Sequence, residues 1–204
     1  LSDNLTLTYK KKSNLRYGEN PHQSASSYKI INNNEPNILN AIIHQGKELS
    51  YNNIMDADGA LACLKEFDEP ACVIVKHSNP CGVSVGKDLL KIYDRAFNAD
   101  SISAFGGIVA FNRTCTEDVA EAISKVFVEI VLAPKFDKNS IEIFKNKKNL
   151  RVLEIGEIRK RAHKLEVRNI DGGLLVQDVD NKRLRENDLK VVTKTSPSTK
   201  DIET

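Results

Sequence analysis

The sequence lacks the features that would mark a membrane or nucleic-acid-binding protein. Its 204 residues contain 30 Lys and Arg against 28 Asp and Glu, and this net charge of +2 gives no reason to expect an acidic partner. No apolar run approaches the roughly 18 residues that a membrane helix needs, and no signal peptide is visible. We therefore expect a soluble protein that binds neither nucleic acid nor membrane.

Cysteine is also scarce. Cys63, Cys72, Cys81 and Cys115 show no C-x-x-C spacing and form no cluster with histidine. The apolar neighbours of Cys63 and Cys72 indicate that these two are small buried hydrophobic residues. We expect reduced thiols in a cytoplasmic protein, with neither disulfides nor zinc.

Several common catalytic motifs are missing as well. There is no P-loop, and Gly106-Gly107 does not form G-x-G-x-x-G. Zinc deaminases need P-C-x-x-C, but Gly82-Val83-Ser84 follows Pro80-Cys81. The segment 82–86 has the ends of G-x-S-x-G but leads away from the preceding strand, which argues against a nucleophile elbow.

What the sequence does contain is an alternation of helix and strand patterns. Apolar content of 40% with 28% charged residues is typical of a globular protein. Hydrophobic periodicity predicts helices over 54–66, 89–97, 117–126 and 140–147, and strands over 71–75, 108–111, 128–133 and 151–155. This order predicts an α/β fold with a mostly parallel sheet.

The flanking segments are less regular. Residues 1–14 indicate a linker or an exposed strand leading into the domain. Short strands are expected at 28–31, 174–178 and 190–193, while 39–45 is ambiguous between strand and helix. Residues 196–204 indicate the start of a helix, with Ser198 or Thr199 as N-cap, and we expect the sequence to be a piece of a longer protein.

Lys76 and His77 are the first candidates for chemistry. They follow the β-branched run 73–75 and precede the turn formers Ser78, Asn79, Pro80 and Gly82, which predict a loop. Both side chains favour a positive charge, so each disfavours the charge of the other. A neutral histidine could accept a proton while the ammonium stabilises negative charge. The alternative is a plain turn histidine beside a solvated lysine.

Three further segments are candidates for ligand binding. Arg16 and Tyr17 could bind a phosphate and stack on a planar ring, although a solvated loop would look the same. Gly106, in the Gly-Gly pair before a strand, permits close approach of a ligand but could equally mark a bulge. Glu129 lies in the apolar run 127–132, so it is either on an exposed face or buried with a partner.

Seven collinear motifs together resemble a known family. They are LRYGENPHQ (15–23), GKELSYNNIMDAD (46–58), PACVIVKHSNPCG (70–82), SAFGGIVAFNR (103–113), FVEIVLAP (127–134), RVLEIG (151–156) and NIDGGLLVQD (169–178). They are similar to the transformylase domain of the bacterial-type enzymes of purine biosynthesis that join phosphoribosylaminoimidazolecarboxamide (AICAR) formyltransferase to IMP cyclohydrolase. The resemblance implies a three-layer α/β sandwich, cytidine-deaminase-like without zinc.

The resemblance also implies a reaction and a set of site residues. The formyl group of 10-formyltetrahydrofolate would move to the 5-amino group of AICAR. His77 would accept the amine proton, and Lys76 would stabilise the oxyanion and keep His77 neutral. The nucleotide would be bound by Arg16 on the phosphate side, by Tyr17 near the ring, and by Asn53, Gly106 and Glu129.

The same resemblance implies that parts of the enzyme are missing. Residues 15–195 would be the first half of the transformylase domain, without the cyclohydrolase domain and without the second half. In the family that second half carries much of the folate site and a monovalent-cation site, and the full-length enzyme is a homodimer. We therefore expect this chain alone to be inactive; the alternative is a non-catalytic nucleotide-binding or assembly module.

Overall fold

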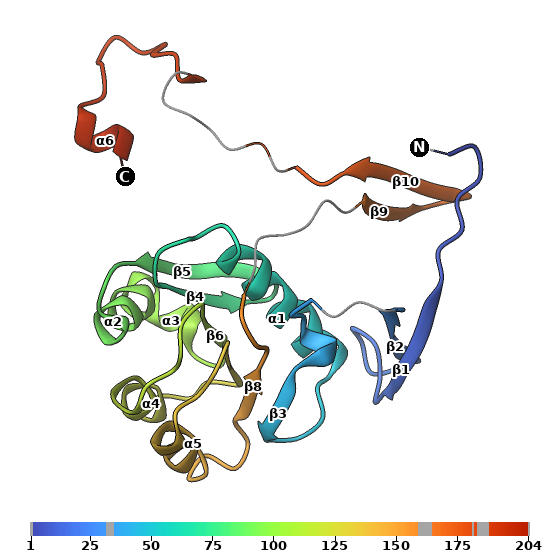
Figure 1. Cartoon of the computed structure of the whole chain (residues 1–204), viewed down its shortest axis with the longest axis horizontal. Coiled ribbons are helices and arrows are strands. Elements are labelled where there is room, and N and C mark those ends of the chain that lie inside the picture. The colour runs from blue at the N-terminus through green and yellow to red at the C-terminus, as the bar shows by residue number, and fades with distance from the viewer. Residues whose placement is uncertain (1, 32–34, 159–164, 181, 183–187, 204) are drawn as a thin grey trace. The chain divides into compact units, whose positions relative to one another are not determined.

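The computed structural model describes residues 2–31, 35–158, 165–180, 182 and 188–203 (Figure 1). The chain divides into two compact units, Leu1–Lys160 and Arg161–Thr204. Each unit is considered by itself.

The first unit is built on a six-stranded mixed sheet. Its strand order is β3 (Ile42–Gln45), β8 (Arg151–Glu154), β7 (Ile130–Ala133), β6 (Ile108–Phe111), β4 (Ala71–Lys76) and β5 (Asn79–Val85). The β6–β7 and β7–β8 pairs are parallel, whereas β3–β8, β4–β6 and β4–β5 are antiparallel. The prediction of a mostly parallel sheet was therefore wrong.

The direction of β4 explains this error. Residues 71–75 are completely buried, as the continuous apolar run predicted, but such a run fits any central strand whatever its direction. The expected loop after Lys76 is only the two-residue turn His77–Ser78, and the chain returns at once as β5. Pro80 is tolerated there because β5 is an edge strand.

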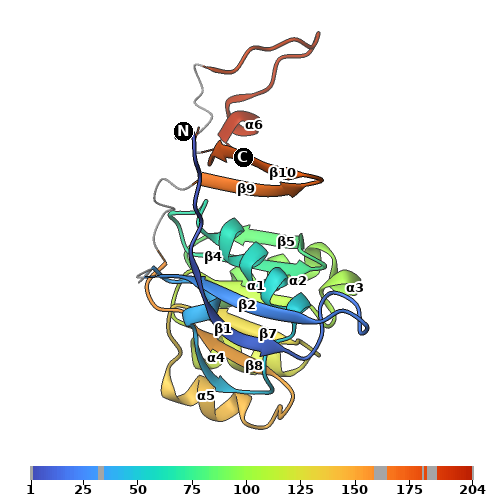
Figure 2. The ribbon, with the colours of Figure 1, turned by 90° about the vertical axis from the view of Figure 1, so that its right-hand side faces the viewer.

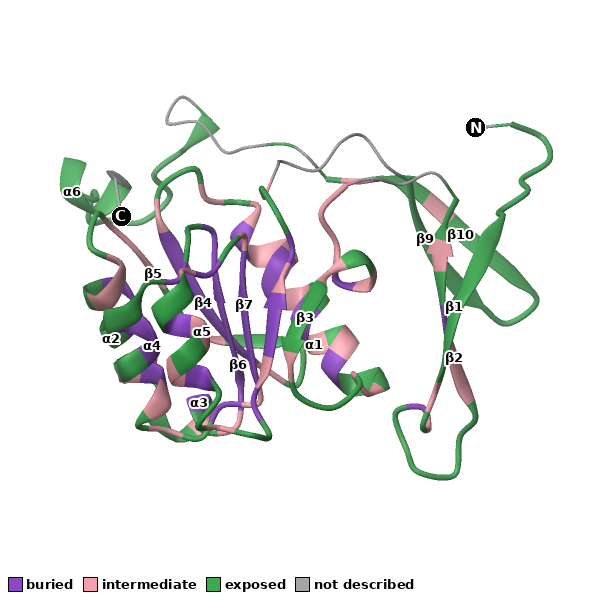
Figure 3. Cartoon of the chain, turned by 60° about the horizontal axis from the view of Figure 1, so that its bottom comes forward, coloured by how far each residue is buried: buried purple, intermediate pink, exposed green. Residues whose placement is uncertain are grey.

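Helices cover both faces of the sheet, which gives the layered α/β arrangement (Figure 3). Cys72 and Ile74 of β4 pack into one buried cluster, which includes residues of α2 (Leu89–Ala99), α4 (Glu117–Ser124) and α5 (Lys138–Phe144). Val73 and Val75 point the other way, into the cluster that includes residues of α1 (Tyr51–Leu64). This alternation along β4 places two cores back to back across the sheet.

Side-chain caps set where several helices begin. Ser50 and Asn53 form a reciprocal capping box, so α1 starts at Tyr51, earlier than the predicted residue 54. Thr116 is the N-cap of α4, although its side chain makes no capping hydrogen bond. The short helix α3 (Ser101–Ala104) is capped by Asp100, and it leads directly to the Gly106 loop.

Before the sheet, β1 (Tyr9–Leu15) and β2 (Ala25–Ile30) pair as an antiparallel two-stranded ribbon (Figure 2). The ambiguous segment 39–45 resolves into the end of a 3₁₀ helix, η1 (Ile38–Asn40), and β3.

The second unit contains the hairpin of β9 (Leu165–Ile170) and β10 (Gly173–Asp178), and the short helix α6 (Thr199–Glu203). The strand predicted at 190–193 was wrong. Val191 and Val192 are exposed, Val192 by 85%, and a β-branched pair without a neighbouring strand does not make a strand.

Across both units, the described residues include no helix of the length and apolarity that crossing a membrane requires.

Of the two cysteines expected to be buried, Cys63 and Cys72, only Cys72 is fully buried. Cys72 and Cys115 are buried, and burial raises the pKa of both thiols. Cys63, in contrast, is only partly buried.

Candidate active site

One cavity of about 970 Å³ in the first unit brings together the seven candidate site residues named from the sequence. Its lining includes Arg16, Tyr17, Asn53, Lys76, His77, Gly106 and Glu129. They come from the end of β1, from α1, from the β4–β5 turn, and from the segments that precede β6 and β7. The roles given to them above stay predictions.

His77 sits on a strained turn. Among the described non-glycine residues, only His77 (φ 52°) and Ser78 (φ 61°) have positive φ. Positive φ at both central residues is the signature of a type I′ hairpin turn, which normally uses Asn-Gly or a similar pair. A non-glycine residue in this region costs about 1–3 kcal/mol, and such strain clusters at functional sites.

Hydrogen bonds from neighbouring segments hold this turn. The Ser78 backbone N–H and Oγ both donate to Asp56 Oδ1, at 2.7 and 3.0 Å. Asn79 Nδ2 donates to the His77 carbonyl at 2.9 Å. Asp56 lies on α1 and also lines the cavity, and the sequence interpretation missed it.

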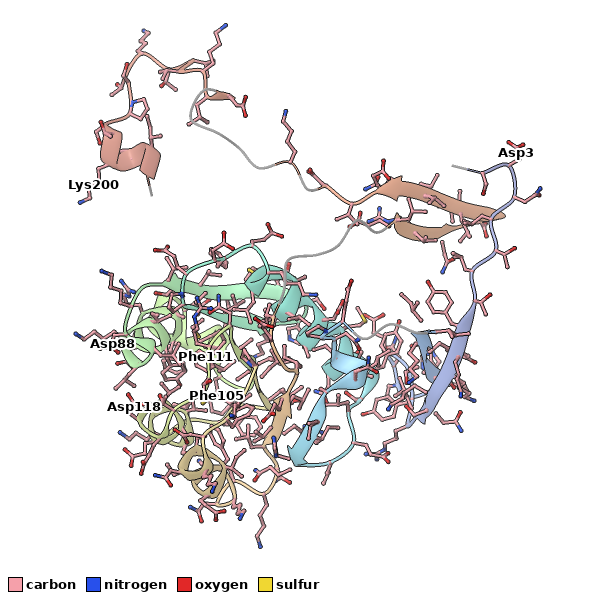
Figure 4. All side chains as sticks on the ribbon, viewed as in Figure 1. Asp3, Asp88, Phe105, Phe111, Asp118 and Lys200 are labelled. Atoms are coloured by element: carbon pink, nitrogen blue, oxygen red, sulfur yellow. The ribbon has the colours of Figure 1, made fainter. Side chains whose placement is uncertain are left out.

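Lys76 joins the β4 end of the cavity to the Gly106 loop. Its Nζ donates to the carbonyl of Phe105 at 2.9 Å; Phe105 is one of the residues labelled in Figure 4. Gly106 has φ +72°, and a Cβ there would stand 3.2 Å from the Phe127 ring. The positive φ favours glycine here, because residues that carry a β-carbon rarely adopt this conformation.

Glu129 has two partners at one of its carboxylate oxygens. Asn53 Nδ2 donates to Glu129 Oε2 at 2.9 Å, and Arg151 Nη1 lies 3.9 Å from the same oxygen. The Glu129 side chain is 43% exposed and precedes β7 rather than lying within it. The carboxylate is therefore partnered but still open to the cavity.

Arg151 is a cavity residue that the sequence interpretation did not identify. Its side chain is 16% exposed, and its Nε is buried without a hydrogen-bond partner. Gly46 approaches it so closely that a Cβ there would stand 2.7 Å from Arg151 Cγ. The sequence showed its place at the start of the strand predicted over 151–155, but not that this strand pairs with β7 beside Glu129.

Arg16 and Tyr17 form the wall nearest β1. The Arg16 guanidinium carbon lies 5.6 Å from the centre of the Tyr17 ring, a cation–π distance. Gly18 N–H donates to the Gln23 carbonyl at 2.8 Å and closes the loop that follows. The Arg16 side chain remains exposed, so it is available to an anion.

The cavity carries more positive than negative groups. Its lining includes the cations Lys12, Arg16, Lys47, Lys76 and Arg151, and the acids Glu48, Asp56 and Glu129. This balance suits an anionic ligand with polar groups elsewhere. Within the described part of the chain, no three His, Cys, Asp or Glu side chains are grouped in a way that could hold a metal.

A layered α/β unit with a cation-rich cavity and a histidine on a strained turn is typical of a small-molecule enzyme. The family model of the AICARFT/IMPCHase bienzyme matches residues 1–204, and the chain therefore belongs to that family. This confirms the resemblance drawn from the motifs.

Two individual proteins are similar to the chain to different degrees. The bifunctional purine biosynthesis protein PurH of Caldicellulosiruptor saccharolyticus is 48% identical over 203 residues, which cover 98% of this chain and 39% of that relative. The chain thus spans well under half of the relative's length. A solved structure of Acinetobacter baumannii RibD overlaps 48% of this chain and 33% of its own, at a TM-score of 0.34 and 18% identity. That overlap is too low to assign a fold.

Proposed function

We propose that this chain carries the acid–base pair and part of the nucleotide pocket of an AICAR formyltransferase. The observation that supports this most directly is the convergence of seven motif residues on one cavity, with His77 held in a strained conformation directly after Lys76. The reaction is the transfer of a formyl group from 10-formyltetrahydrofolate to the 5-amino group of AICAR.

The chemistry requires a base and a stabilised oxyanion. An aromatic amine is a weak nucleophile, so His77 takes the amine proton as the new C–N bond forms. Lys76 stabilises the negative charge that develops on the formyl oxygen. When the bond from the formyl carbon to N10 of the folate breaks, His77 returns the proton to N10.

The remaining cavity residues position the nucleotide. Arg16 binds the phosphate, for which a guanidinium is well suited, and Tyr17 lies near the base ring. Gly106 lets the ligand approach the backbone. Asn53 holds Glu129 through the 2.9 Å hydrogen bond and leaves the second carboxylate oxygen for the ligand.

The rest of the enzyme is assigned to segments outside this chain. In this proposal residues 15–195 are the first half of the transformylase domain in a cytoplasmic homodimer. The second half supplies most of the folate pocket and a monovalent-cation site, and a separate domain closes the ring to IMP. The fold is then cytidine-deaminase-like without zinc.

A second candidate function is a nucleotide-binding or assembly module without catalysis. Phe105 and Phe127 form a ring pair beside Gly106, with centroids 5.4 Å apart, and they are 58% and 49% exposed. Two exposed aromatic rings at the edge of a cavity indicate a surface that another part covers. Titrating the 204-residue chain with AICAR and then with a folate analogue separates the two: binding of the nucleotide alone supports the module.

The decisive experiment is the His77→Ala substitution in the complete gene product that contains these residues. We expect kcat for formyl transfer to fall about 10²- to 10⁴-fold, the usual contribution of a general base. AICAR affinity, measured by calorimetry, should change little. His44→Ala is the matched control, because His44 pairs with Glu154 on β8 and does not line the cavity. Full activity of His77→Ala would refute the role of the base.

A further inference from the structure

The left-handed turn that carries His77 needs a restraint, because neither of its residues is a glycine. At φ 52° and 61°, His77 and Ser78 adopt a conformation that β-carbon-bearing residues disfavour. The hairpin could relax toward other turns, and the imidazole would move with it. Whatever fixes the turn therefore also fixes the position of the proposed base.

Asp56 supplies that restraint from α1. One carboxylate oxygen, Oδ1, accepts from both the N–H (2.7 Å) and the hydroxyl (3.0 Å) of Ser78. Hydrogen bonds to an ionised acceptor are about twice as strong as neutral ones. The two bonds tie the second turn residue to a helix, 22 positions away in the sequence.

The helix is itself well placed to act as a rigid support. Gly59 lies about one turn further along α1, where a Cβ would make an ordinary van der Waals contact, 3.5 Å, with the Ser78 carbonyl oxygen. Asn53, three residues before Asp56, donates to Glu129 on the far wall of the cavity. Residues 53, 56 and 59 share one helical face, so α1 connects the His77 turn to the carboxylate wall.

We propose that Asp56 is a positioning residue that keeps the His77–Ser78 turn in its left-handed conformation and thereby holds His77 in the cavity. This role rests on the proposed formyl transfer, in which His77 is the base. Asp56 acts through Ser78 and has no proton-transfer step of its own.

The test is a set of substitutions in the complete gene product. Asp56→Ala removes the acceptor and should lower kcat about 10- to 100-fold, because a base displaced by about 1 Å loses that much. The KM for AICAR should change less than threefold. Asp56→Asn keeps an acceptor oxygen at the same position and should recover most of kcat. Asp58→Ala is the matched control, since Asp58 is an exposed acid on the same helix and does not line the cavity.

A readout that does not depend on activity comes from the 204-residue chain. Amide hydrogen exchange should show the Ser78 N–H exchanging at least tenfold faster in Asp56→Ala than in the unsubstituted chain. The amides of β4 should keep their protection. Asp58→Ala should leave the Ser78 amide unchanged.

The outcomes separate the two hypotheses. Activity of Asp56→Ala within threefold of the unsubstituted protein, equal losses in Asp56→Ala and Asp56→Asn, or unchanged protection of the Ser78 amide would each overturn the role of Asp56. An unsubstituted protein without formyl-transfer activity would overturn the proposed function instead, and the exchange measurement would still decide whether Asp56 holds the turn.

Discussion

Two hairpins of this chain make the same connection with different residues. In each, a two-residue turn joins antiparallel strands: His77–Ser78 between β4 and β5, and Asp171–Gly172 between β9 and β10. The second turn places its positive φ, 78°, on a glycine. The first has positive φ at two residues that carry β-carbons.

The difference indicates that the His77–Ser78 turn is less stable than an Asp-Gly turn but fixes the position of the His77 side chain. Asp-Gly is a common turn pair and needs no outside support. His-Ser is a poor one, and it is held by Asp56 and Asn79. A strained pair that is restrained from outside, at the edge of a cavity, indicates a turn selected for its side chain.

Exchanging the two turns is the strongest way to break this comparison. Replacing His77 by Asn and Ser78 by Gly should abolish most formyl transfer, with kcat falling about 10²- to 10⁴-fold because the base is lost. The free energy of unfolding should rise by about 1 kcal/mol, because Asn-Gly relieves the strain. Kinetics of the complete gene product and urea denaturation of the chain measure the two effects.

The reciprocal exchange is the control. Asp171→His with Gly172→Ser should leave kcat unchanged, because the β9–β10 turn has no assigned role in the reaction. A swapped β4–β5 turn that kept its activity, or that destabilised the chain by more than 1 kcal/mol, would contradict the functional explanation of the strain.

The strands of the two hairpins should also differ in how they tolerate a methyl group. A Cβ on Gly82 of β5 would stand 2.0 Å from the backbone oxygen of Ala96 in α2, whereas one on Gly173 of β10 would meet nothing within 4 Å. Gly82→Ala should lower the free energy of unfolding by about 3 kcal/mol or more, since a backbone atom cannot rotate away. Gly173→Ala should change it by less than about 0.5 kcal/mol. Urea midpoints followed by circular dichroism test both, and similar values for the two would refute the packing argument.

The sequence predicted the layers of the first unit better than the direction of its strands. The buried run 71–75 and the helices on both sides follow from hydrophobic periodicity. That β4 runs antiparallel to both neighbours does not, because side-chain burial is the same for either direction. The β9 strand was missed for a related reason: all its residues are exposed, so burial left no pattern.

The candidate site was predictable only through the family motifs. Taken alone, Lys76 and His77 were barely distinguishable from a solvated turn, and Gly106 from a bulge. Asp56 and Arg151 were missed because their contacts are tertiary: one reaches a turn 22 residues away, and the other meets Glu129 across a parallel strand pair. A sequence does not show which strands are neighbours.

The smallest expected effect concerns Asp100, whose helix α3 leads to the Phe105 carbonyl that binds Lys76. The Ser103 hydroxyl and then the Ser103 N–H lower the pKa of Asp100 below its usual value. The cap therefore stabilises the folded chain above about pH 4, the ordinary range of an aspartate, and is lost as the pH falls through the lowered value. The gap in urea midpoint between the unsubstituted chain and Asp100→Ala should be present at pH 7 and narrow as the pH falls below about 4.

Asp201 is the matched control from the second unit, because hydrogen bonds from Ser198 lower its pKa in the same way. Asp201→Ala should leave the Lys76 side of the cavity, and hence kcat, unchanged. A gap for Asp100→Ala that grew as the pH fell would have the wrong sign for a carboxylate cap. It would contradict the role of Asp100 in holding α3, the helix that leads to the Phe105 carbonyl beside Lys76.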